Sequence, residues 1–213
     1  MSLIKGMLLS FDDPLLGLIP TVILFQYNPD TLTRVFTLEE AASGASGAGS
    51  TPGAALSAPK PAKEAYSLKL EFDATDGLEK GAPITSGFGI APRLASLEML
   101  VQPVGSSLLG GLVGSLLGGS SGATVPAGKV PLVYFAWGPA RITPVRLTSL
   151  SIHETAFDEL LNPIHASADV GLTVLRKDDL AADDTIARAA ADFYQAAREV
   201  KAVLALPQTI ELA

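Results

Sequence analysis

Segments in which apolar and polar side chains alternate recur along this chain and restrict it to folds built around a β-sheet. In residues 66–77 (YSLKLEFDATDG), Leu68, Leu70 and Phe72 alternate with charged side chains, which predicts a strand with one buried and one solvated face. Residues 166–175 (ASADVGLTVL) alternate in the same way. Two continuous apolar runs that end in Pro or Gly predict strands covered on both faces, TVILFQYNP and PLVYFAWGP.

The stretch PVRLTSLSIHETAF carries a change of phase in its apolar pattern. Val145 and Leu147 share one face of an extended chain, whereas Leu150 has the opposite parity. One extra residue in the strand restores a common face, so the pattern predicts a β-bulge near Thr148 and Ser149.

Two helices are expected beside the strands, which gives a mainly β fold of the α+β class. Pro92 suits the first turn of a helix in APRLASLEMLVQP, and Pro103 ends it. A second helix is expected from Asp183 to Leu206, with Asp183 or Asp184 as its N-cap. Apolar residues recur along it at spacings of four and three and mark a candidate partner interface: Ile186, Ala190, Phe193, Ala197, Val200 and Leu204.

Length and composition limit the classes of function. The chain has 213 residues, enough for one main domain, which we expect over 1–175 with a helical extension over 176–213. Its formal net charge of −7 argues against a phosphate-neutralising surface, and so against nucleic acid as a partner. The absence of cysteine excludes disulfides, thiolate nucleophiles and cysteine-based zinc sites.

Two low-complexity segments interrupt the pattern. Residues 41–65 are small, polar and Pro-bearing, and we expect them to form a flexible insertion. Residues 104–128 form a Gly/Leu-rich loop whose leucines are expected to pack on the core or on a neighbouring subunit. The apolar runs in this loop and at the N-terminus are too short for a membrane span, which argues against a membrane role. A protein that associates with a membrane surface through residues 104–128 stays a further alternative.

Both histidines of the chain lie in HETAFDELLNPIH, residues 153–165, which raises the question of a metal or catalytic site. The HExxH zinc motif fails because residue 157 is Phe. A hairpin could still bring His153 and His165 together near Asp169, so a two-histidine metal site stays geometrically open.

The same stretch is also typical of a β-hairpin connection. Asn162 favours a turn and Pro163 fixes φ, so the chain is expected to reverse here. Phe157, Leu160 and Ile164 are expected to pin the connection to the core. No GxSxG elbow or complete dinucleotide loop is present, and no catalytic residue is assigned.

Taken in order, several segments resemble a known family. These are FQYNPDTLTRVF, LKLEFDATD, RLASLEMLVQP, VYFAWG and LTSLSIHETAFDELLNPIHASADVGLTVL. Together they are similar to the tube-type domain of contractile injection systems. More narrowly, they resemble the baseplate adaptor that joins the spike to the inner tube in extracellular phage-tail-like particles. The resemblance spans most of residues 1–175 and lies in the ordered set.

The resemblance implies a tail-tube-like antiparallel β-barrel or split sandwich with one packed helix, which closes with its own copies into a hexameric ring. It implies a structural role without catalysis or cofactor, in which the subunit links the spike to the tube and templates tube assembly. The implied partners are its own copies, the inner tube protein, the spike or hub protein and other baseplate subunits. Assembly would take place in the bacterial cytoplasm, and the particle would then be released or stay there.

The chain departs from the family pattern after Leu175. Adaptors of this kind commonly continue into a LysM-like module, and the residues that mark it are missing here. An inner-tube or cap-proximal subunit is therefore an alternative to the adaptor. A further alternative, from another class, is a small metal-dependent enzyme or ligand-binding barrel that uses His153, His165 and Asp169. Under the structural reading, the architectural residues are turn residues: Asn28, Pro29, Trp137, Gly138, Asn162 and Pro163.

Overall fold

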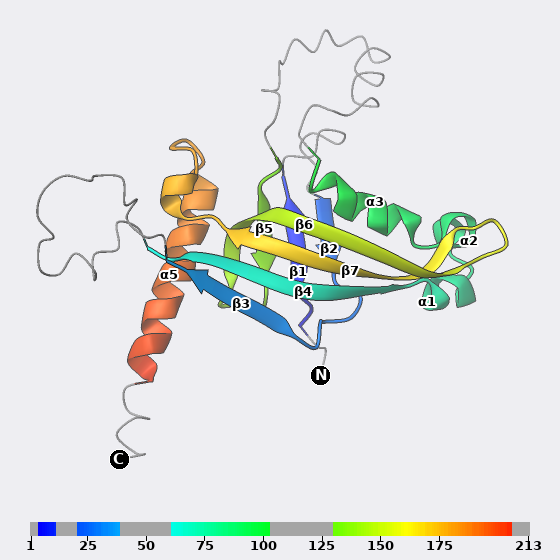
Figure 1. Ribbon diagram of the computed structural model, residues 1–213, viewed down its shortest axis with the longest axis horizontal. Helices are drawn as coiled ribbons and strands as arrows, with labels where there is room; N and C mark the ends of the chain where they lie inside the picture. Colours follow the sequence, from blue (N-terminus) through cyan, green and yellow to red (C-terminus); the bar gives the residue numbers. More distant parts are fainter. Residues whose placement is uncertain (1–3, 12–20, 39–60, 103–129, 206–213) are drawn as a thin grey trace, which may run out of the picture.

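The computed structural model describes residues 4–11, 21–38, 61–102 and 130–205. Its strands form one antiparallel sheet in the order β2-β1-β5-β6-β7-β4-β3 (Figure 1). The strands are β1 (Met7–Ser10), β2 (Thr21–Leu24), β3 (Leu32–Thr37), β4 (Lys63–Asp73), β5 (Val133–Ala136), β6 (Ile142–Phe157) and β7 (Pro163–Val174). The helices are α1 (Thr75–Glu79), α2 (Pro83–Phe88), α3 (Ala91–Met99) and α5 (Thr185–Leu204), with a 3₁₀ turn η2 (Lys177–Asp179). The predicted α+β class is confirmed.

The sheet is not closed into a barrel, so the barrel expectation is wrong. Strands β2 and β3 stand at the two ends of the strand order and do not pair with each other in the described part of the chain. The sheet nevertheless curls, because β6 pairs with β5 over Ile142–Val145 and with β7 over Val145–Phe157. The rings of Tyr66 in β4 and Phe135 in β5 lie 5.3 Å apart, although two strands separate β4 from β5 in the order. The two halves of the sheet therefore face each other across a core without sharing a closing ladder.

The predicted β-bulge is confirmed. The register between β6 and β7 shifts between Leu147 and Ser149, so that Leu150 lies opposite Val170. At this point Ser149 approaches the neighbouring strand closely, and a Cβ on Gly171 would lie 2.2 Å from the Ser149 hydroxyl oxygen. The bulge thus turns Leu150 and Ile152 of β6 toward the core, and a larger residue at position 171 would make the Ser149 hydroxyl rotate away.

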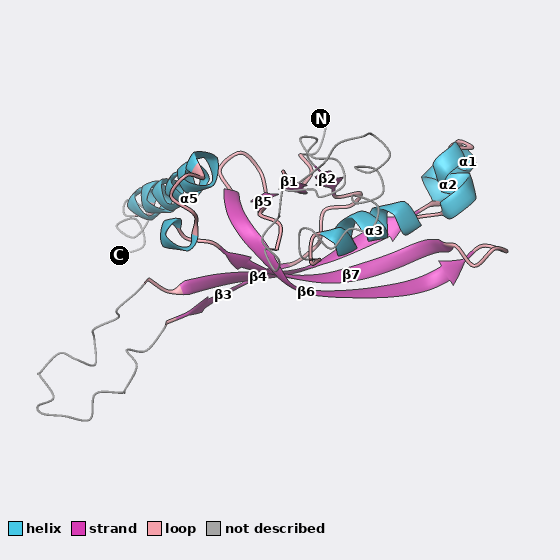
Figure 2. Ribbon diagram, turned by 90° about the horizontal axis from the view of Figure 1, so that it is seen from above, coloured by secondary structure: helices cyan, strands magenta, loops and turns pink. Residues whose placement is uncertain are grey.

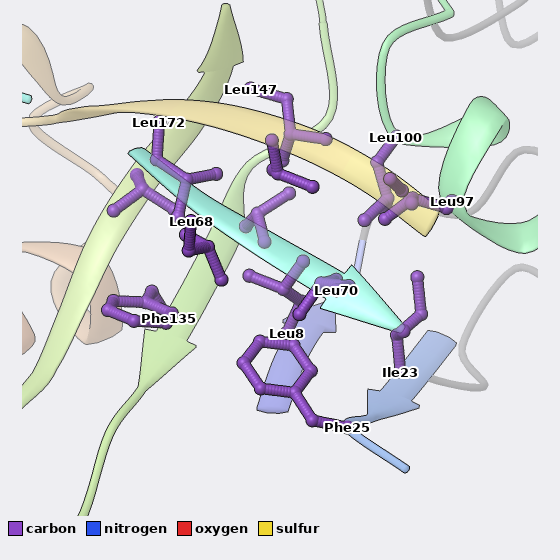
Figure 3. Packing of buried hydrophobic residues seen from close by; sticks show 14 of the residues in the cluster. Leu8, Ile23, Phe25, Leu68, Leu70, Leu97, Leu100, Phe135, Leu147 and Leu172 are labelled. Carbon is purple, nitrogen blue, oxygen red and sulfur yellow. The ribbon is translucent and has the colours of Figure 1, made fainter. Parts of the chain in front are cut away.

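The core lies between the curled halves of the sheet and helix α3. Alternate residues of β4 and β7 point into it, as predicted from their sequence pattern, and α3 adds Leu94 and Leu97. Figure 3 shows these side chains meeting residues from β1, β2, β5 and β6 and from the position after β2. The labelled members of the core are Leu8, Ile23, Phe25, Leu68, Leu70, Leu97, Leu100, Phe135, Leu147 and Leu172. Each fully buried side chain of this size contributes about 1.5–3 kcal/mol of hydrophobic stabilisation.

Both predicted helices form. Pro92 lies in the first turn of α3, and Asp184 is the N-cap of α5, where its carboxylate accepts a hydrogen bond from Ala187 N at 3.0 Å. The helix α5 ends at Leu204, two residues before the predicted end. Pro103, the predicted end of the first helix, lies outside the described residues.

The predicted insertion over 41–65 is too long by three residues, because β4 already begins at Lys63. Glu64 and Ala65 belong to the strand, where the backbone is paired with β3 and the Glu64 side chain is buried. The rest of that segment before residue 61, and the Gly/Leu-rich loop at 104–128, lie outside the described residues. Among the described helices, none has the length and apolar content needed to cross a membrane.

Candidate assembly surfaces

A buried carboxylate holds helix α5 against the sheet. Glu64 is only 4% exposed, and its Oε1 accepts hydrogen bonds from Arg34 Nη2 and Tyr194 Oη, both at 2.7 Å. Its Oε2 accepts a hydrogen bond from Arg198 Nη1 at 3.2 Å. The Tyr194 hydroxyl also lies 2.5 Å from that of Tyr66. This Glu64 cluster (Arg34, Glu64, Tyr66, Tyr194 and Arg198) joins β3, β4 and α5.

The electrostatics of the Glu64 cluster suit a structural role. Burial raises the pKa of Glu64, but hydrogen bonds from Tyr194 and Arg34 outweigh this effect, and its pKa lies below the ordinary value. Burial raises the pKa of the Tyr66 and Tyr194 hydroxyls. Tyr194 donates its proton to Glu64, so Tyr66 is the donor in the pair of hydroxyls. An ionised carboxylate whose two oxygens both accept hydrogen bonds holds its donors in place and is poorly suited to proton transfer.

Sequence reasoning missed the Glu64 cluster. Glu64 and Tyr66 stand at the same parity as Leu68 and Leu70 in β4, so the buried face of this strand extends two positions further toward its start. A glutamate in phase with a buried face was the available signal, since buried carboxylates require partners.

We expect Glu64→Gln to lower the free energy of unfolding by about 1–2 kcal/mol at pH 7, because an amide loses the charge-assisted hydrogen bonds to the two arginines. The folded-state pKa of Glu64 is depressed, so its contribution is fully present above the unfolded value near 4.5 and is lost as pH falls through the folded value. Urea unfolding at pH 7, 5, 4 and 3 should show the wild type and the variant converging in acid.

Glu199→Gln is the matched control, because Glu199 is an exposed carboxylate of α5 that accepts a hydrogen bond from Gln195 Nε2. We expect it to change the free energy of unfolding by less than about 0.5 kcal/mol. A Glu64→Gln effect that is as small as this, or that does not change with pH, would contradict the role given to the carboxylate.

The predicted interface residues of α5 are not the residues that the helix buries against the rest of the molecule. Its buried residues are Ala187 and Tyr194, and the helix contacts β6 and η2. In Figure 1, α5 lies across one end of the sheet and runs beyond it. The larger side chains of the predicted stripe are exposed and its alanines are partly buried: Ile186, Ala190, Phe193, Ala197, Val200 and Leu204. The structure thus leaves the larger side chains of this apolar stripe exposed.

The β6–β7 hairpin is closed by a hydrogen-bonded turn. Asp158 Oδ1 accepts hydrogen bonds from the backbone N–H groups of Leu160 and Asn162, both at 2.8 Å, and Asn162 Nδ2 donates to Asp158 Oδ2 at 2.8 Å. The hydrogen bonds from Asn162 and Leu160 hold the pKa of Asp158 below its usual value. Pro163 begins β7 and accepts a hydrogen bond from Ile90 N at 2.9 Å. The stretch around the two histidines is therefore part of a hairpin, as one of the two interpretations predicted.

The expected packing of this turn is wrong for two of its three residues. Phe157 is 48% exposed and Leu160 is 77% exposed, and only Ile164 packs against the core. The reason is strand length: β6 continues to Phe157 and β7 starts at Pro163, so the turn lies beyond the end of the core.

The predicted turn residues Asn28 and Pro29 follow β2. Asn28 Oδ1 accepts a hydrogen bond from Gly6 N and its Nδ2 donates to Ile4 O, both at 2.9 Å. The side chain thus ties the segment after β2 to the segment before β1, and Pro29 continues the connection toward β3.

Trp137 and Gly138 form the start of the β5–β6 connection. Trp137 N donates to Arg141 O at 2.8 Å, and Gly138 has φ 75°, a conformation that favours glycine. The Trp137 ring lies 6.0 Å from that of Phe135 and 6.4 Å from that of Phe25. Through these contacts the Trp137 ring covers one end of the aromatic part of the core.

The histidines do not assemble a metal site in the described residues. Thr155 Oγ1 lies 2.8 Å from His165 Nδ1, and Glu71 Oε2 lies 3.8 Å from His165 Nε2. His153 lies opposite Ser167 in the β6–β7 register. Over the parts of the chain that the structure describes, no group of three or more His, Asp or Glu side chains is placed to hold a metal ion.

No protein-family model matches the chain, and the comparison with curated proteins finds no match. The resemblance to tube-type domains of contractile injection systems therefore stays a prediction from sequence.

Proposed function

We propose that this chain is a structural, ring-forming subunit at the junction of tube and baseplate in a contractile injection particle, where it links the spike to the inner tube and templates tube assembly. The observation that carries the proposal is the curled antiparallel sheet, in which the end strands β2 and β3 each pair with one neighbour among the described strands. Such a sheet suits cyclic assembly, because unpaired edges in a monomer invite pairing with other chains.

The edge strands favour contact with other chains. In β2, Val22 and Leu24 are exposed, and in β3, Val35 is exposed. Edge strands of proteins that act as monomers are usually protected by charge, proline or a covering segment. Exposed apolar side chains on both edge strands therefore support a subunit that is completed by its neighbours.

The face of the sheet that points away from the core is suited to line a water-filled channel. Lys69 of β4 lies opposite Asp169 of β7, and Glu71 lies opposite Ser167. His153 of β6 is exposed on the same face, opposite Ser167. A charged and polar surface of this kind fits a channel lining better than a buried interface.

The proposed role involves no catalysis and no cofactor. Its partners are further copies of the chain, the inner tube protein, the spike or hub protein and other baseplate subunits. The subunit assembles in the bacterial cytoplasm and then remains in a particle that is released or retained. The saturated Glu64 cluster and the turn residues act in this proposal as architecture.

The test is to mix the purified protein with the products of its neighbouring genes and with tube and spike proteins of contractile injection particles, and to follow assembly by native mass spectrometry and negative-stain imaging. We expect closed rings, or recruitment of the protein to one end of a tube. A protein that stays monomeric with each of these partners would refute the proposed role.

Phe193→Asp should reduce assembly about tenfold or more while leaving the fold intact, because it places a charge in the exposed apolar stripe of α5. The measurement is the yield of rings or capped tubes, with circular dichroism as the check on folding. Gln195→Asp is the matched control, since it adds the same charge at an exposed position of α5 outside the stripe. Equal yields from the two variants would exclude the stripe from assembly.

A further inference from the structure

A second apolar surface lies at the opposite end of the molecule from α5. Its members come from α2 and from the end of the β6–β7 hairpin, and all are large and exposed: Ile84, Phe88, Phe157, Leu160 and Leu161. We call this set the tip patch. Its two parts are joined, because Asn162 Nδ2 donates to Gly87 O at 3.2 Å and Ile90 N donates to Pro163 O at 2.9 Å. Monomeric proteins rarely gather this many large apolar side chains at one exposed point.

The turn presents two of these side chains in a fixed conformation. Leu160 and Leu161 are 77% and 78% exposed, and Leu161 has φ 63°, the one positive value among the described non-glycine residues. Such a conformation costs of order 1 kcal/mol or more for a bulky residue and persists only where the surroundings enforce it. The hydrogen bonds that Asp158 accepts from Leu160 and Asn162 supply that constraint. The turn therefore holds two leucines in solvent at a conformational cost, which a purely structural turn does not require.

The tip patch and the α5 stripe lie at the two ends of the long axis. Figures 1 and 2 both place α5 at one end, and α1, α2 and the hairpin turn at the other. The two surfaces are therefore too far apart to cover each other within one chain. They can meet between copies, by a contact that joins the tip of one molecule to the helix of the next.

The exposed face of α5 has the pattern of a helix-packing seam. Ile186, Phe193 and Val200 recur every seven residues, and Ala189, Ala196 and Val203 follow each of them by three. All of these side chains are exposed. Small residues between large ones form holes into which side chains of a second element can insert. Two adjacent leucines on a rigid turn are suited to such holes.

The charges around the tip patch disfavour contact between two tips. The segments that carry the tip patch, residues 75–88 and 154–162, hold five acidic residues and one lysine: Asp76, Glu79, Glu154, Asp158, Glu159 and Lys80. Helix α5 holds three basic and two acidic residues: Arg188, Arg198, Lys201, Asp192 and Glu199. In α5, Arg198 donates to Glu64 and Arg188 donates to the carbonyl oxygens of Lys177 and Leu180, and two aspartates, Asp183 and Asp184, precede the helix, so its surroundings are close to neutral. An acidic tip repels a second acidic tip more strongly than it repels this helix, so the charges favour a head-to-tail contact over a tip-to-tip contact.

From this arrangement we propose that the tip patch of one copy docks on the α5 stripe of a second copy, with Leu160 and Leu161 inserted beside Phe193 and Val200. The contact is heterologous, because two different surfaces of the same chain meet, and repetition of it closes a ring or extends a stack. This proposed contact rests on the proposed function only because both require the chain to assemble with its own copies. It adds which two surfaces meet.

The test uses single-cysteine variants, which have no background because the chain contains no cysteine. Leu160→Cys and Val200→Cys are purified separately, checked for folding, and oxidised alone and as a mixture. We expect the mixture to give a disulfide-linked dimer at least tenfold faster than either variant alone. The pair Glu159→Cys and Lys201→Cys repeats the test with every apolar side chain of both surfaces left in place.

The control mixture is Leu160→Cys with Gln195→Cys, since Gln195 is exposed on α5 outside the stripe. Equal cross-linking in the control mixture, dimers of Leu160→Cys alone at the same rate, or no cross-link in either test pair would overturn the proposed contact. Rings that form without the cross-link would refute this contact and leave the proposed function standing. A specific cross-link in a protein that never joins tubes or spikes would support this contact and refute the proposed function.

Discussion

Phe135→Ala should lower the free energy of unfolding by about 3–5 kcal/mol, the range for loss of a fully buried phenylalanine. The Phe135 side chain is fully buried, and its ring lies 5.3 Å from that of Tyr66 and 6.0 Å from that of Trp137. It stands where the two halves of the curled sheet meet, so its removal leaves a cavity that several strands would have to move together to fill. Urea denaturation at pH 7 measures the change, and the midpoint of thermal unfolding should fall by roughly 6–20 °C.

Phe88→Ala is the control for this prediction. Phe88 is 59% exposed at the end of α2, so its truncation should change the free energy of unfolding of the monomer by about 0.5 kcal/mol or less. If the two alanine variants unfold at the same urea concentration, the two halves of the sheet do not share the core described above.

Gly89→Ala should be nearly as damaging, with a loss of about 3 kcal/mol or more. Gly89 has φ 57°, which disfavours alanine by about 1 kcal/mol or more, and an added Cβ would lie 2.1 Å from the carbonyl oxygen of Pro163. That carbonyl accepts the hydrogen bond from Ile90 N, so the clash pushes α3 away from the base of the hairpin. Urea denaturation measures the loss of stability.

Two other glycines separate the causes of this effect. Gly81 has φ 60° with open space around its Cβ position, so Gly81→Ala should cost only about 1 kcal/mol. Gly87 lies in α2 with open space around it and no positive φ, so alanine there should be neutral or should stabilise by up to about 1 kcal/mol. If Gly89→Ala is no worse than Gly81→Ala, the close approach to Pro163 is not a constraint on the fold.

Local pattern was enough to predict five of the strands (β2, β4, β5, β6 and β7), helices α3 and α5 and the bulge in β6, but it missed β1, β3, α1 and α2. The expectation that the strand in TVILFQYNP is covered on both faces is wrong, because β2 is an edge strand and its Val22 and Leu24 are exposed. The bulge is instructive, because the change of parity between Leu147 and Leu150 records an extra residue that any register with a common buried face requires. In the same way, Asp184 and the spacing of apolar residues after it specify where α5 begins. These features depend on neighbours in sequence, which is why a single chain reveals them.

The curvature of the sheet and the Glu64 cluster could not be predicted in this way. Whether seven strands close depends on how far each ladder twists, and no residue pattern states that β2 and β3 stay apart. Arg34, Glu64 and Tyr194 meet only after strands and helix have packed, from positions up to 160 residues apart. The turn at Leu161 was placed correctly, but its exposure depends on where the core ends, which is a property of the whole fold.

The pairing of β4 with β7 has a consequence for synthesis on the ribosome. The strand β3 precedes β4 in synthesis, but Asp73 and His165 are register partners, so about ninety residues of chain must be added after β4 before β7, its neighbour on the other side, exists. At the usual rate of 5–20 residues per second, β4 remains without β7 for roughly 5–20 s. During that time the nascent chain offers a strand that other nascent chains on the same message could capture. Slow translation of residues 74–162 should therefore favour misassembled chains, and chaperones that cover apolar strands on the ribosome should matter more for the yield of this protein than for its final stability.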